Sequence, residues 1–146
     1  MENPDKHKIL KHLTEDVYVR VGRSKIHGVG LIAVRDIPQG ADPFKNLYEP
    51  DTIPFTDEEL AGIPAPVRDM VDDYFGKEDG LIYIPVTGMN PLDLLHFINH
   101  SDTPNVKTIN EGWTFCALHD IPAGEELFSD YSTYDEGYKN ADFVKK

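Results

Sequence analysis

Short stretches of apolar residues, or of alternating apolar and polar residues, recur along the chain between turn-forming residues. A period of two, or a compact apolar run of this length, predicts a β-strand. The predicted strands cover residues 17–21, 30–34, 81–86, 114–118 and 126–129. The chain is therefore expected to be mainly β.

Two segments carry helical signals instead. Residues 56–59 fit the capping box that begins a helix, and apolar residues continue at helical spacing as far as Phe75. Prolines within residues 64–66 predict an interruption of this helix. Residues 90–97 predict a shorter helix, with an asparagine at the cap and a proline at the first helical position. The predicted fold class is mainly β with short helices (β+α).

Length and charge limit the possible functions. A chain of 146 residues is expected to form a single domain over residues 1–146. Acidic residues outnumber basic ones 26 to 14, for a net charge of −12. A surface that neutralises nucleic-acid phosphates is not expected from this balance, which favours a basic protein or peptide as partner.

Cysteine content and hydropathy bear on the compartment. Cys116 is the only cysteine, which excludes an internal disulfide and a zinc cluster built from several cysteines. No stretch approaches the ~20 apolar residues of a membrane span, and the first residues lack the apolar segment of a secretory signal. We expect an intracellular protein, cytoplasmic or nuclear, that does not bind membranes.

A glycine pair stands before the second predicted strand. Gly28, Val29 and Gly30, with Ala33, fit the dinucleotide-binding fingerprint, and an acidic residue lies about 20 positions downstream. That fingerprint must open a helix, whereas the residues after Gly30 are β-prone and the run ends at Pro38. We interpret the pair as a loop entering a strand, which disfavours a dinucleotide-dependent oxidoreductase. Such a loop lets the main chain approach an anionic ligand group.

Two histidines, His96 and His100, are four residues apart and could share a helix face. A zinc protease would need glutamate at position 97, where this chain has Phe97. We therefore expect no catalytic metal, and a structural metal site completed by His119 or an acid is the alternative.

Three blocks together identify a family. They are Gly28-Val29-Gly30, then Asn99-His100-Ser101 with Asn105, then Gly124-Glu125-Glu126-Leu127-Phe128-Ser129-Asp130-Tyr131. In this order the sequence resembles the SET domain of protein lysine methyltransferases over about residues 17–131. The resemblance implies small curved sheets and a C-terminal pseudoknot that brings Asn99 and Tyr131 together. It also implies a variable inserted region at about 42–90, followed at the end of the chain by an aromatic tail, 132–146.

The resemblance implies an S-adenosylmethionine-dependent protein lysine N-methyltransferase, similar to histone-lysine methyltransferases. Tyr131 is the implied catalytic residue, which orients the lysine amine. The implied cofactor-binding residues are Gly28, Val29, Gly30, Asn99, His100, Tyr131, Tyr134 and Tyr138. The implied substrate channel contains Tyr48, Phe128 and Ser129, and the small Ser129 leaves room for a di- or trimethylated product.

Some features depart from the family pattern. Lys45 and Asn46 stand where relatives often carry a Glu-Tyr pair that lines the channel, and cysteine-rich zinc segments are absent. The alternative function is a catalytically weak or inactive SET-fold module that acts through protein contacts. A monomer and a homodimer both agree with the sequence.

Overall fold

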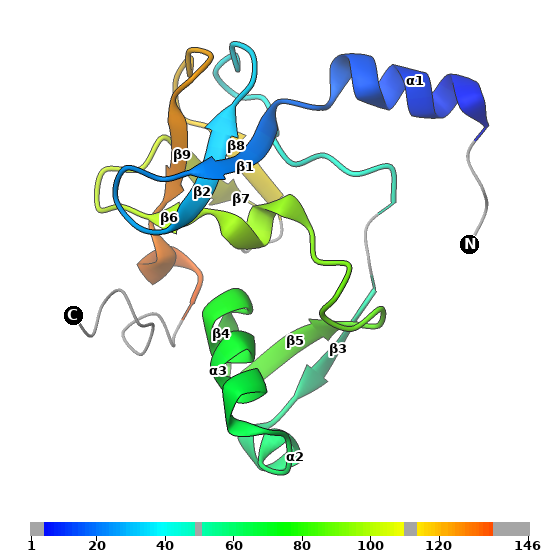
Figure 1. Cartoon of the computed structure of the whole chain (residues 1–146), viewed down its shortest axis with the longest axis vertical. Coiled ribbons are helices and arrows are strands. Elements are labelled where there is room, and N and C mark those ends of the chain that lie inside the picture. The colour runs from blue at the N-terminus through cyan, green and yellow to red at the C-terminus, as the bar shows by residue number, and fades with distance from the viewer. Residues whose placement is uncertain (1–4, 49–50, 110–113, 136–146) are drawn as a thin grey trace.

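The computed structural model describes residues 5–48, 51–109 and 114–135, mostly as short strands with a few short helices. This confirms the predicted fold class. The chain forms a main region built on a four-stranded sheet and a second region, residues 52–85, which we call the insert (Figure 1).

The main sheet joins segments from both ends of the chain. Its strand order is β1 (Val19–Arg23), β2 (Val29–Ala33), β9 (Glu126–Ser129), β6 (Asn99–His100). The pairs β1–β2 and β2–β9 are antiparallel, whereas β6 and β9 run parallel, with Asn99 opposite Phe128. This pairing places Asn99 and His100 directly beside β9, although the two strands are distant in the sequence.

A hairpin of β7 (Val106–Ile109) and β8 (Thr114–Ala117) completes the main core. The ten buried residues of this cluster are Val19, Leu31, Ala33, Ile37, Ile98, Val106, Phe115, Ala117, Ile121 and Leu127. Their burial fixes the register of the sheet, since a slip by one residue would turn every apolar side chain to the other face.

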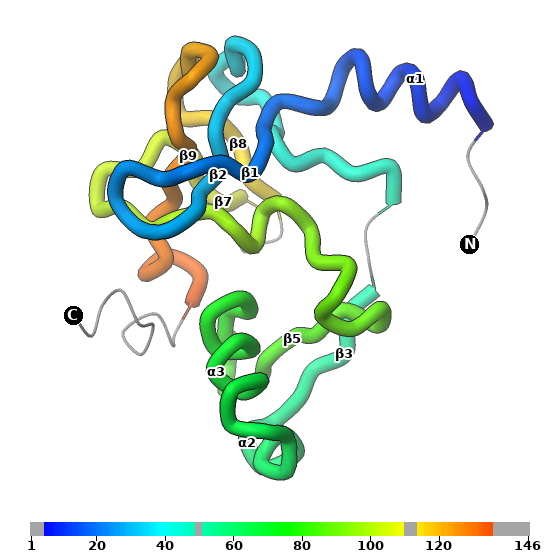
Figure 2. The backbone as a smooth tube through the Cα atoms, in the orientation of Figure 1, coloured from blue at the N-terminus to red at the C-terminus, as the bar shows by residue number. Residues whose placement is uncertain are grey.

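The insert is made of consecutive residues and lies at the opposite end of the molecule from the β1–β2 hairpin (Figure 2). Its sheet has the order β3 (Thr52–Phe55), β5 (Leu81–Pro85), β4 (Lys77–Glu78). The helices α2 (Asp57–Leu60) and α3 (Ala65–Tyr74) complete it. Four residues form its own buried cluster: Leu60, Val71, Phe75 and Ile82.

Local sequence signals account for the helices of the insert. Thr56 accepts a hydrogen bond from the Glu59 N–H at 3.2 Å, and the Glu59 carboxylate accepts one from the Thr56 N–H at 3.0 Å, which confirms the capping box. The predicted interruption is also found, because α2 ends at Leu60 and α3 begins at Ala65, with a proline in its first turn.

The helix predicted over residues 90–97 is wrong in extent. Only a 3₁₀ helix, η1 (Leu94–Phe97), forms there, with Asp93 at its N-cap. Asp93 has an extended backbone, and its carboxylate accepts a hydrogen bond from Asn46 at 3.2 Å.

A helix near the N-terminus, α1 (Lys6–Glu15), was not predicted. Its apolar residues Ile9, Leu10 and Leu13 lie at helical spacing, but all three are exposed and none packs in a buried cluster. Arg35 holds its C-terminal end by donating to the Thr14 and Glu15 carbonyls. Beyond that end α1 projects from the body of the molecule (Figure 1).

Candidate functional site

The segment 98–105 is bound to the C-terminal strand through both backbone and side chains. Asn105 accepts a hydrogen bond from the Phe128 N–H at 2.8 Å and donates to the Glu126 carbonyl at 2.9 Å. Its own N–H donates to the Phe128 carbonyl at 3.2 Å. The carboxamide of Asn105 therefore extends the β-pairing and holds β6 and β9 in place.

The glycine pair is required by two different constraints. Gly28 has φ of +54°, a left-handed conformation that glycine adopts without steric cost. At Gly30 a Cβ would lie 2.3 Å from a Glu126 carboxylate oxygen and 2.9 Å from the Asn99 amide nitrogen. Because β2 begins at Val29, the pair leads into a strand and the dinucleotide-binding helix is absent from this segment.

Asn99 fastens the glycine loop to the main sheet. Its amide nitrogen lies 3.2 Å from the His27 carbonyl, 3.0 Å from the Val29 carbonyl and 2.9 Å from the Glu126 carboxylate. The Asn99 side chain therefore fixes the position of the loop relative to β6.

Successive side chains of an extended chain point to opposite sides, and at residues 98–99 the two sides have different surroundings. Asn99 is directed to the glycine loop, whereas its neighbour Ile98 is buried in the main core and lines a cavity on the other side. Tyr131 stands at the boundary. Its N–H donates to His100 Nδ1 at 3.0 Å, and its hydroxyl donates to the Ile98 carbonyl.

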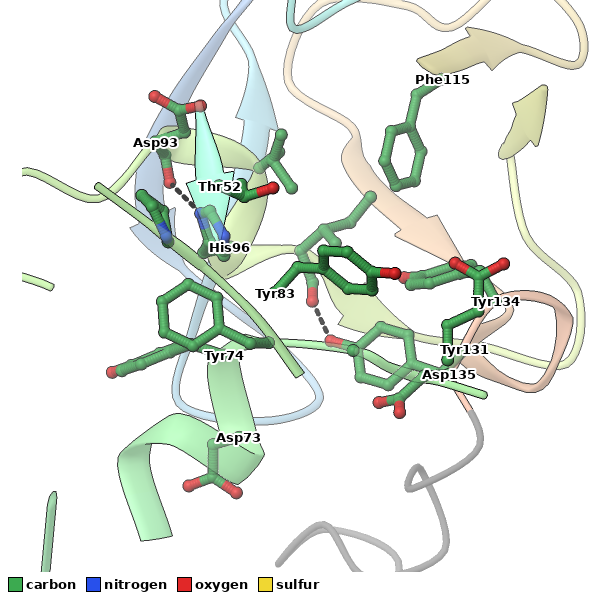
Figure 3. Close-up of a pocket in the computed structure, with 16 residues that line it drawn as sticks. Thr52, Asp73, Tyr74, Tyr83, Asp93, His96, Phe115, Tyr131, Tyr134 and Asp135 are labelled. Atoms are coloured by element: carbon green, nitrogen blue, oxygen red, sulfur yellow. Dashed lines mark hydrogen bonds between the residues drawn. The ribbon is translucent and has the colours of Figure 1, made fainter. Parts of the chain in front are cut away.

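The cavity has a volume of about 220 Å³ and lies between the insert and the main region (Figure 3). Six aromatic residues line it: Tyr74, Phe75 and Tyr83 from the insert, and Phe115, Tyr131 and Tyr134 from the main region. Figure 3 shows the Tyr83 side chain extending toward Tyr134. Four acidic residues also line it: Asp73, Glu78, Asp93 and Asp135. The cavity thus combines aromatic walls with negative charge.

A contact after the last strand joins the two regions. Asp135 follows the 3₁₀ helix η2 (Tyr131–Thr133), and its carboxylate accepts a hydrogen bond from the Lys77 N–H at 3.0 Å. Asp130 begins η2 by accepting hydrogen bonds from Ser132, which lower the pKa of its carboxyl. This short turn therefore orients Tyr131 and also holds the two walls of the cavity together.

Burial sets the ionisation of the groups around the cavity. It raises the pKa values of Tyr131 and Tyr134 well above the ordinary value, and the charge of Asp135 raises both further. Both phenols are therefore protonated at neutral pH. Burial lowers the pKa of His96, whose Nδ1 lies 3.3 Å from the Asp93 carbonyl, so that its imidazole is neutral.

The predicted site residues divide between the two faces. Tyr131 and Tyr134 line the cavity, and Gly28, Val29, Gly30 and Asn99 lie on the glycine-loop side of β6. The His100 ring lies between the Tyr131 N–H and Asp102, which is 3.0 Å from Nε2. Tyr138 lies outside the described residues.

The predicted channel residues do not line this cavity. Ser129 is 1% exposed, and its hydroxyl lies 2.6 Å from that of Tyr134. Tyr134 is therefore the direct neighbour of this serine. Within the described chain, Tyr48 and Phe128 are also not among the residues that line this cavity.

Sequence reasoning missed the part of the cavity that the insert supplies. Tyr83 belongs to a predicted strand, where its alternation with the buried Ile82 could have placed it on the opposite face. Tyr74 and Phe75 were interpreted only as apolar helix positions. His96 also lines the cavity, and its ring contacts that of Phe75 with 5.1 Å between centroids.

Two further observations concern metal and membrane. His96 lies in η1 and His100 in β6, so they do not share a helix face. In residues 5–48, 51–109 and 114–135 no group of three or more histidine, cysteine or acidic side chains is placed to hold a metal ion. Over the same ranges, no helix has the length and apolar character needed to span a membrane.

Comparison with known proteins adds a family model described as the SET domain, which matches residues 28–132. A provisionally assigned histone methyltransferase from Plasmodium falciparum is similar in structure, with a TM-score of 0.51 and 21% identity over 80% of this chain and 94% of that chain. None of the curated proteins compared matches significantly.

A second similar structure belongs to a humanized mutant of the Chaetomium thermophilum Polycomb Repressive Complex 2 bound to an inhibitor. Its TM-score is 0.55 and its identity 22%, over 86% of this chain. This chain spans only 16% of that one. At these identities both structures establish a shared fold, which is of the lysine methyltransferase type.

Proposed function

Because this chain belongs to the SET domain family, we propose that it is an S-adenosylmethionine-dependent protein lysine N-methyltransferase. The observation that carries the proposal is the position of Tyr131. Its hydroxyl is fixed on the Ile98 carbonyl, at the wall between the aromatic cavity and the glycine loop. A substrate amine on one side and a methyl donor on the other would meet at this tyrosine.

The glycine-loop face fits the cofactor. Apart from Gly28 and its two chain neighbours, no described residue has an atom within 4 Å of the place where a Cβ of Gly28 would stand, and Val29 is 50% exposed, so that the loop is open to a ligand. Gly28, Val29, Asn99 and the main chain at His100 would hold the cofactor. When bound, it supplies a sulfonium methyl carbon: the bond from the lysine nitrogen forms as the bond to sulfur breaks, and sulfur keeps the electron pair.

The residues of the chain would mainly align the reactants. Displacement in line requires the amine, the methyl carbon and the sulfur to be collinear, which makes positioning a large part of catalysis. The Tyr131 hydroxyl donates its hydrogen to the Ile98 carbonyl, and its oxygen would accept a hydrogen bond from the substrate amine and so orient it. A protonated phenol does this without adding a negative charge beside the cation.

The cavity would admit the lysine. Its acidic residues attract a cationic side chain, and its aromatic walls exclude water from the amine. Desolvation and the positive charge of the bound cofactor lower the pKa of the amine and oppose the acidic residues, which raise it, so that its proton can pass to solvent before attack. Tyr134 belongs to this substrate side, as its hydroxyl contact with Ser129 orients its ring along the wall.

The proposal is tested by calorimetric titration with S-adenosylmethionine and by transfer of a labelled methyl group to core histones, used as a basic protein mixture. We expect binding and transfer by the native chain. Asn99→Ala should abolish both, because Asn99 fastens the glycine loop. Asn90→Ala, at an exposed position, is the matched control and should behave like the native chain.

The outcomes separate the two candidate functions. Absence of cofactor binding would overturn the methyltransferase proposal. Cofactor binding without transfer to any basic protein would favour the alternative, a SET-fold module that works through protein contacts.

A further inference from the structure

We infer that Ser24 and Glu126 are positioning residues for the cofactor. Together they fix the orientation of the Asn99 carboxamide, so that its oxygen is available to the ligand as a hydrogen-bond acceptor. The inference rests on the proposed function, because its ligand is the proposed cofactor. Both residues act through Asn99 and the glycine loop, without contact with the ligand.

The hydroxyl of Ser24 has all its hydrogen-bonding positions assigned. Its oxygen accepts hydrogen bonds from the N–H groups of Ile26 at 3.0 Å and of His27 at 3.1 Å. Because both lone pairs are then occupied, the single hydroxyl hydrogen must be donated elsewhere. The Glu126 carboxylate accepts it, with its two oxygens at 2.8 and 3.0 Å. The backbone turn that the Ser24 N–H closes on the Gly28 carbonyl, at 3.0 Å, is thereby fastened to β9.

The same carboxylate helps to decide how the Asn99 carboxamide is oriented. Three oxygens surround one of its two polar atoms: the Glu126 carboxylate at 2.9 Å, the Val29 carbonyl at 3.0 Å and the His27 carbonyl at 3.2 Å. Carbonyl and carboxylate oxygens accept hydrogen bonds, so the atom that faces them must be the NH2 group. The carboxamide oxygen therefore points away from these three acceptors.

The carboxamide oxygen of Asn99 is the atom left for a ligand. No residue that the structure describes donates a hydrogen bond to it. In the described chain, Arg35 Nε is the only buried side-chain nitrogen or oxygen without a partner, so solvent reaches the Asn99 oxygen. A ligand that offers an N–H donor, as S-adenosylmethionine does, would satisfy this acceptor.

The second glycine of the pair makes this arrangement possible. A Cβ at Gly30 would lie 2.3 Å from the Glu126 carboxylate and 2.9 Å from the Asn99 amide nitrogen, so the two side chains can meet there only beside a glycine. Without the carboxylate, the carboxamide could rotate and present its NH2 group to a ligand donor. The expected cost is in ligand affinity, because water satisfies a partly exposed amide in the ligand-free protein.

Calorimetric titration of the full chain with S-adenosylmethionine tests the inference. Glu126→Gln leaves one acceptor oxygen instead of two and removes the charge, so the affinity should fall about tenfold. Ser24→Ala should weaken binding about threefold, since the carboxylate loses one of its two donors. Because Ser24 acts through Glu126, the loss in the double variant should be smaller than the product of the single losses, about thirtyfold.

The controls separate positioning from a general loss of structure. Glu125→Gln is the matched control, because Glu125 is the exposed neighbour of Glu126 and should bind the cofactor like the native chain after substitution. Ser24→Thr keeps a hydroxyl and should restore most of the affinity. In methyl transfer to core histones, KM for the cofactor should rise in Glu126→Gln while kcat stays near the native value.

The orientation of the carboxamide is measured separately, by NMR on the ligand-free chain. The side-chain NH2 signals of Asn99 are identified by their absence in Asn99→Ala. They should shift in Glu126→Gln and in Ser24→Ala, but not in Glu125→Gln. This measurement does not require cofactor binding.

Several outcomes would overturn the inference alone: unchanged cofactor affinity in Glu126→Gln, losses that multiply fully in the double variant, a fall in kcat with KM unchanged, or unchanged Asn99 signals. Absent cofactor binding by the native chain would overturn the proposed function and this inference with it. The behaviour of the native chain therefore distinguishes the two failures.

Discussion

The main region and the insert differ in how they are built. Among the described residues, the main core buries ten apolar residues, with Leu31, Ile37 and Leu127 completely inaccessible, whereas the insert cluster buries four. The main sheet joins strands that are distant in sequence, but the insert is folded from consecutive residues. The main region can therefore hold Tyr131 and the glycine loop rigidly, and the insert adds the wall that a substrate would contact.

In the proposed function, this difference separates the residues that hold the cofactor from the part of the cavity wall that the insert supplies. The residues of the glycine loop, β6 and η2 belong to the main region, and the aromatic residues Tyr74, Phe75 and Tyr83 belong to the insert. The hydrogen bond that the Lys77 N–H donates to the Asp135 carboxylate connects the two regions. We therefore expect a change in the main region to affect cofactor binding and a change in the insert to affect substrate binding.

The largest effect is expected from the main core. Leu127→Ala, at a residue with 0% exposure, should lower the free energy of unfolding by about 3–5 kcal/mol, because the surrounding sheet cannot collapse into the cavity. Leu60→Ala in the smaller insert cluster should cost about 2 kcal/mol. Denaturant unfolding measures both. A loss from Leu60→Ala equal to or greater than that from Leu127→Ala would reverse the comparison.

The second prediction concerns the glycine loop. Gly30→Ala places a methyl group 2.3 Å from Glu126 and must displace that carboxylate or Asn99. We expect the affinity for S-adenosylmethionine to fall about tenfold or more, a loss of about 1.4 kcal/mol, as measured by calorimetry. Gly62→Ala, in open space with an ordinary backbone, is the matched control. Tyr83→Leu should leave cofactor affinity unchanged; a comparable loss there would show that the two regions are not separable.

The third prediction is a pH dependence at the junction. Burial lowers the folded-state pKa of His96 below its ordinary value of 6.5. As pH falls through 6.5 the unfolded chain takes up this proton first, so the stability associated with neutral His96 is present above that pH and is lost as pH falls through the folded-state pKa. His96→Gln should therefore make the decline of the melting temperature between about pH 7 and about pH 5 shallower. Parallel curves for the two proteins would contradict this.

The smallest effect is expected from the surface of the insert. Asp57 pairs with Arg68 at 2.7 Å and with Lys77 at 2.6 Å, and these contacts lower the pKa of its carboxyl. All three side chains are partly exposed, so water and salt screen the pairs. Asp57→Asn should lower the melting temperature only slightly at low salt, and the difference should vanish near ~1 M salt. A large loss that persists at high salt would mean that the insert depends on ion pairs more than on its core.

Sequence was most informative where the signal is local. The capping box of Thr56 and Glu59 and the prolines between α2 and α3 act within a few residues, and the structure has these features where they were predicted. The strands with buried faces were likewise found, although β1 lies two residues later than expected. Helix α1 was missed although Ile9, Leu10 and Leu13 lie at helical spacing and Asp5 caps its first turn, so the local signal was present in the sequence.

The remaining features depend on contacts between distant residues. Strand β6 has only two residues, and its strand character comes from pairing with β9. Tyr134 contacts Ser129, five residues earlier, because η2 turns the chain back. Tyr83 reaches the cavity only because the insert packs beside η2. These outcomes follow from tertiary structure, which the local pattern does not contain.

The most direct test of the central role of Tyr131 compares Tyr131→Phe with the native chain in methyl transfer to core histones and in S-adenosylmethionine binding, with Tyr18→Phe as the matched control. The account predicts that Tyr131→Phe transfers methyl groups about 100-fold more slowly or not at all, since the amine loses its orienting hydroxyl. Cofactor affinity should be unchanged, because the glycine loop and Asn99 are intact. A variant that transfers methyl groups at the native rate would contradict the account.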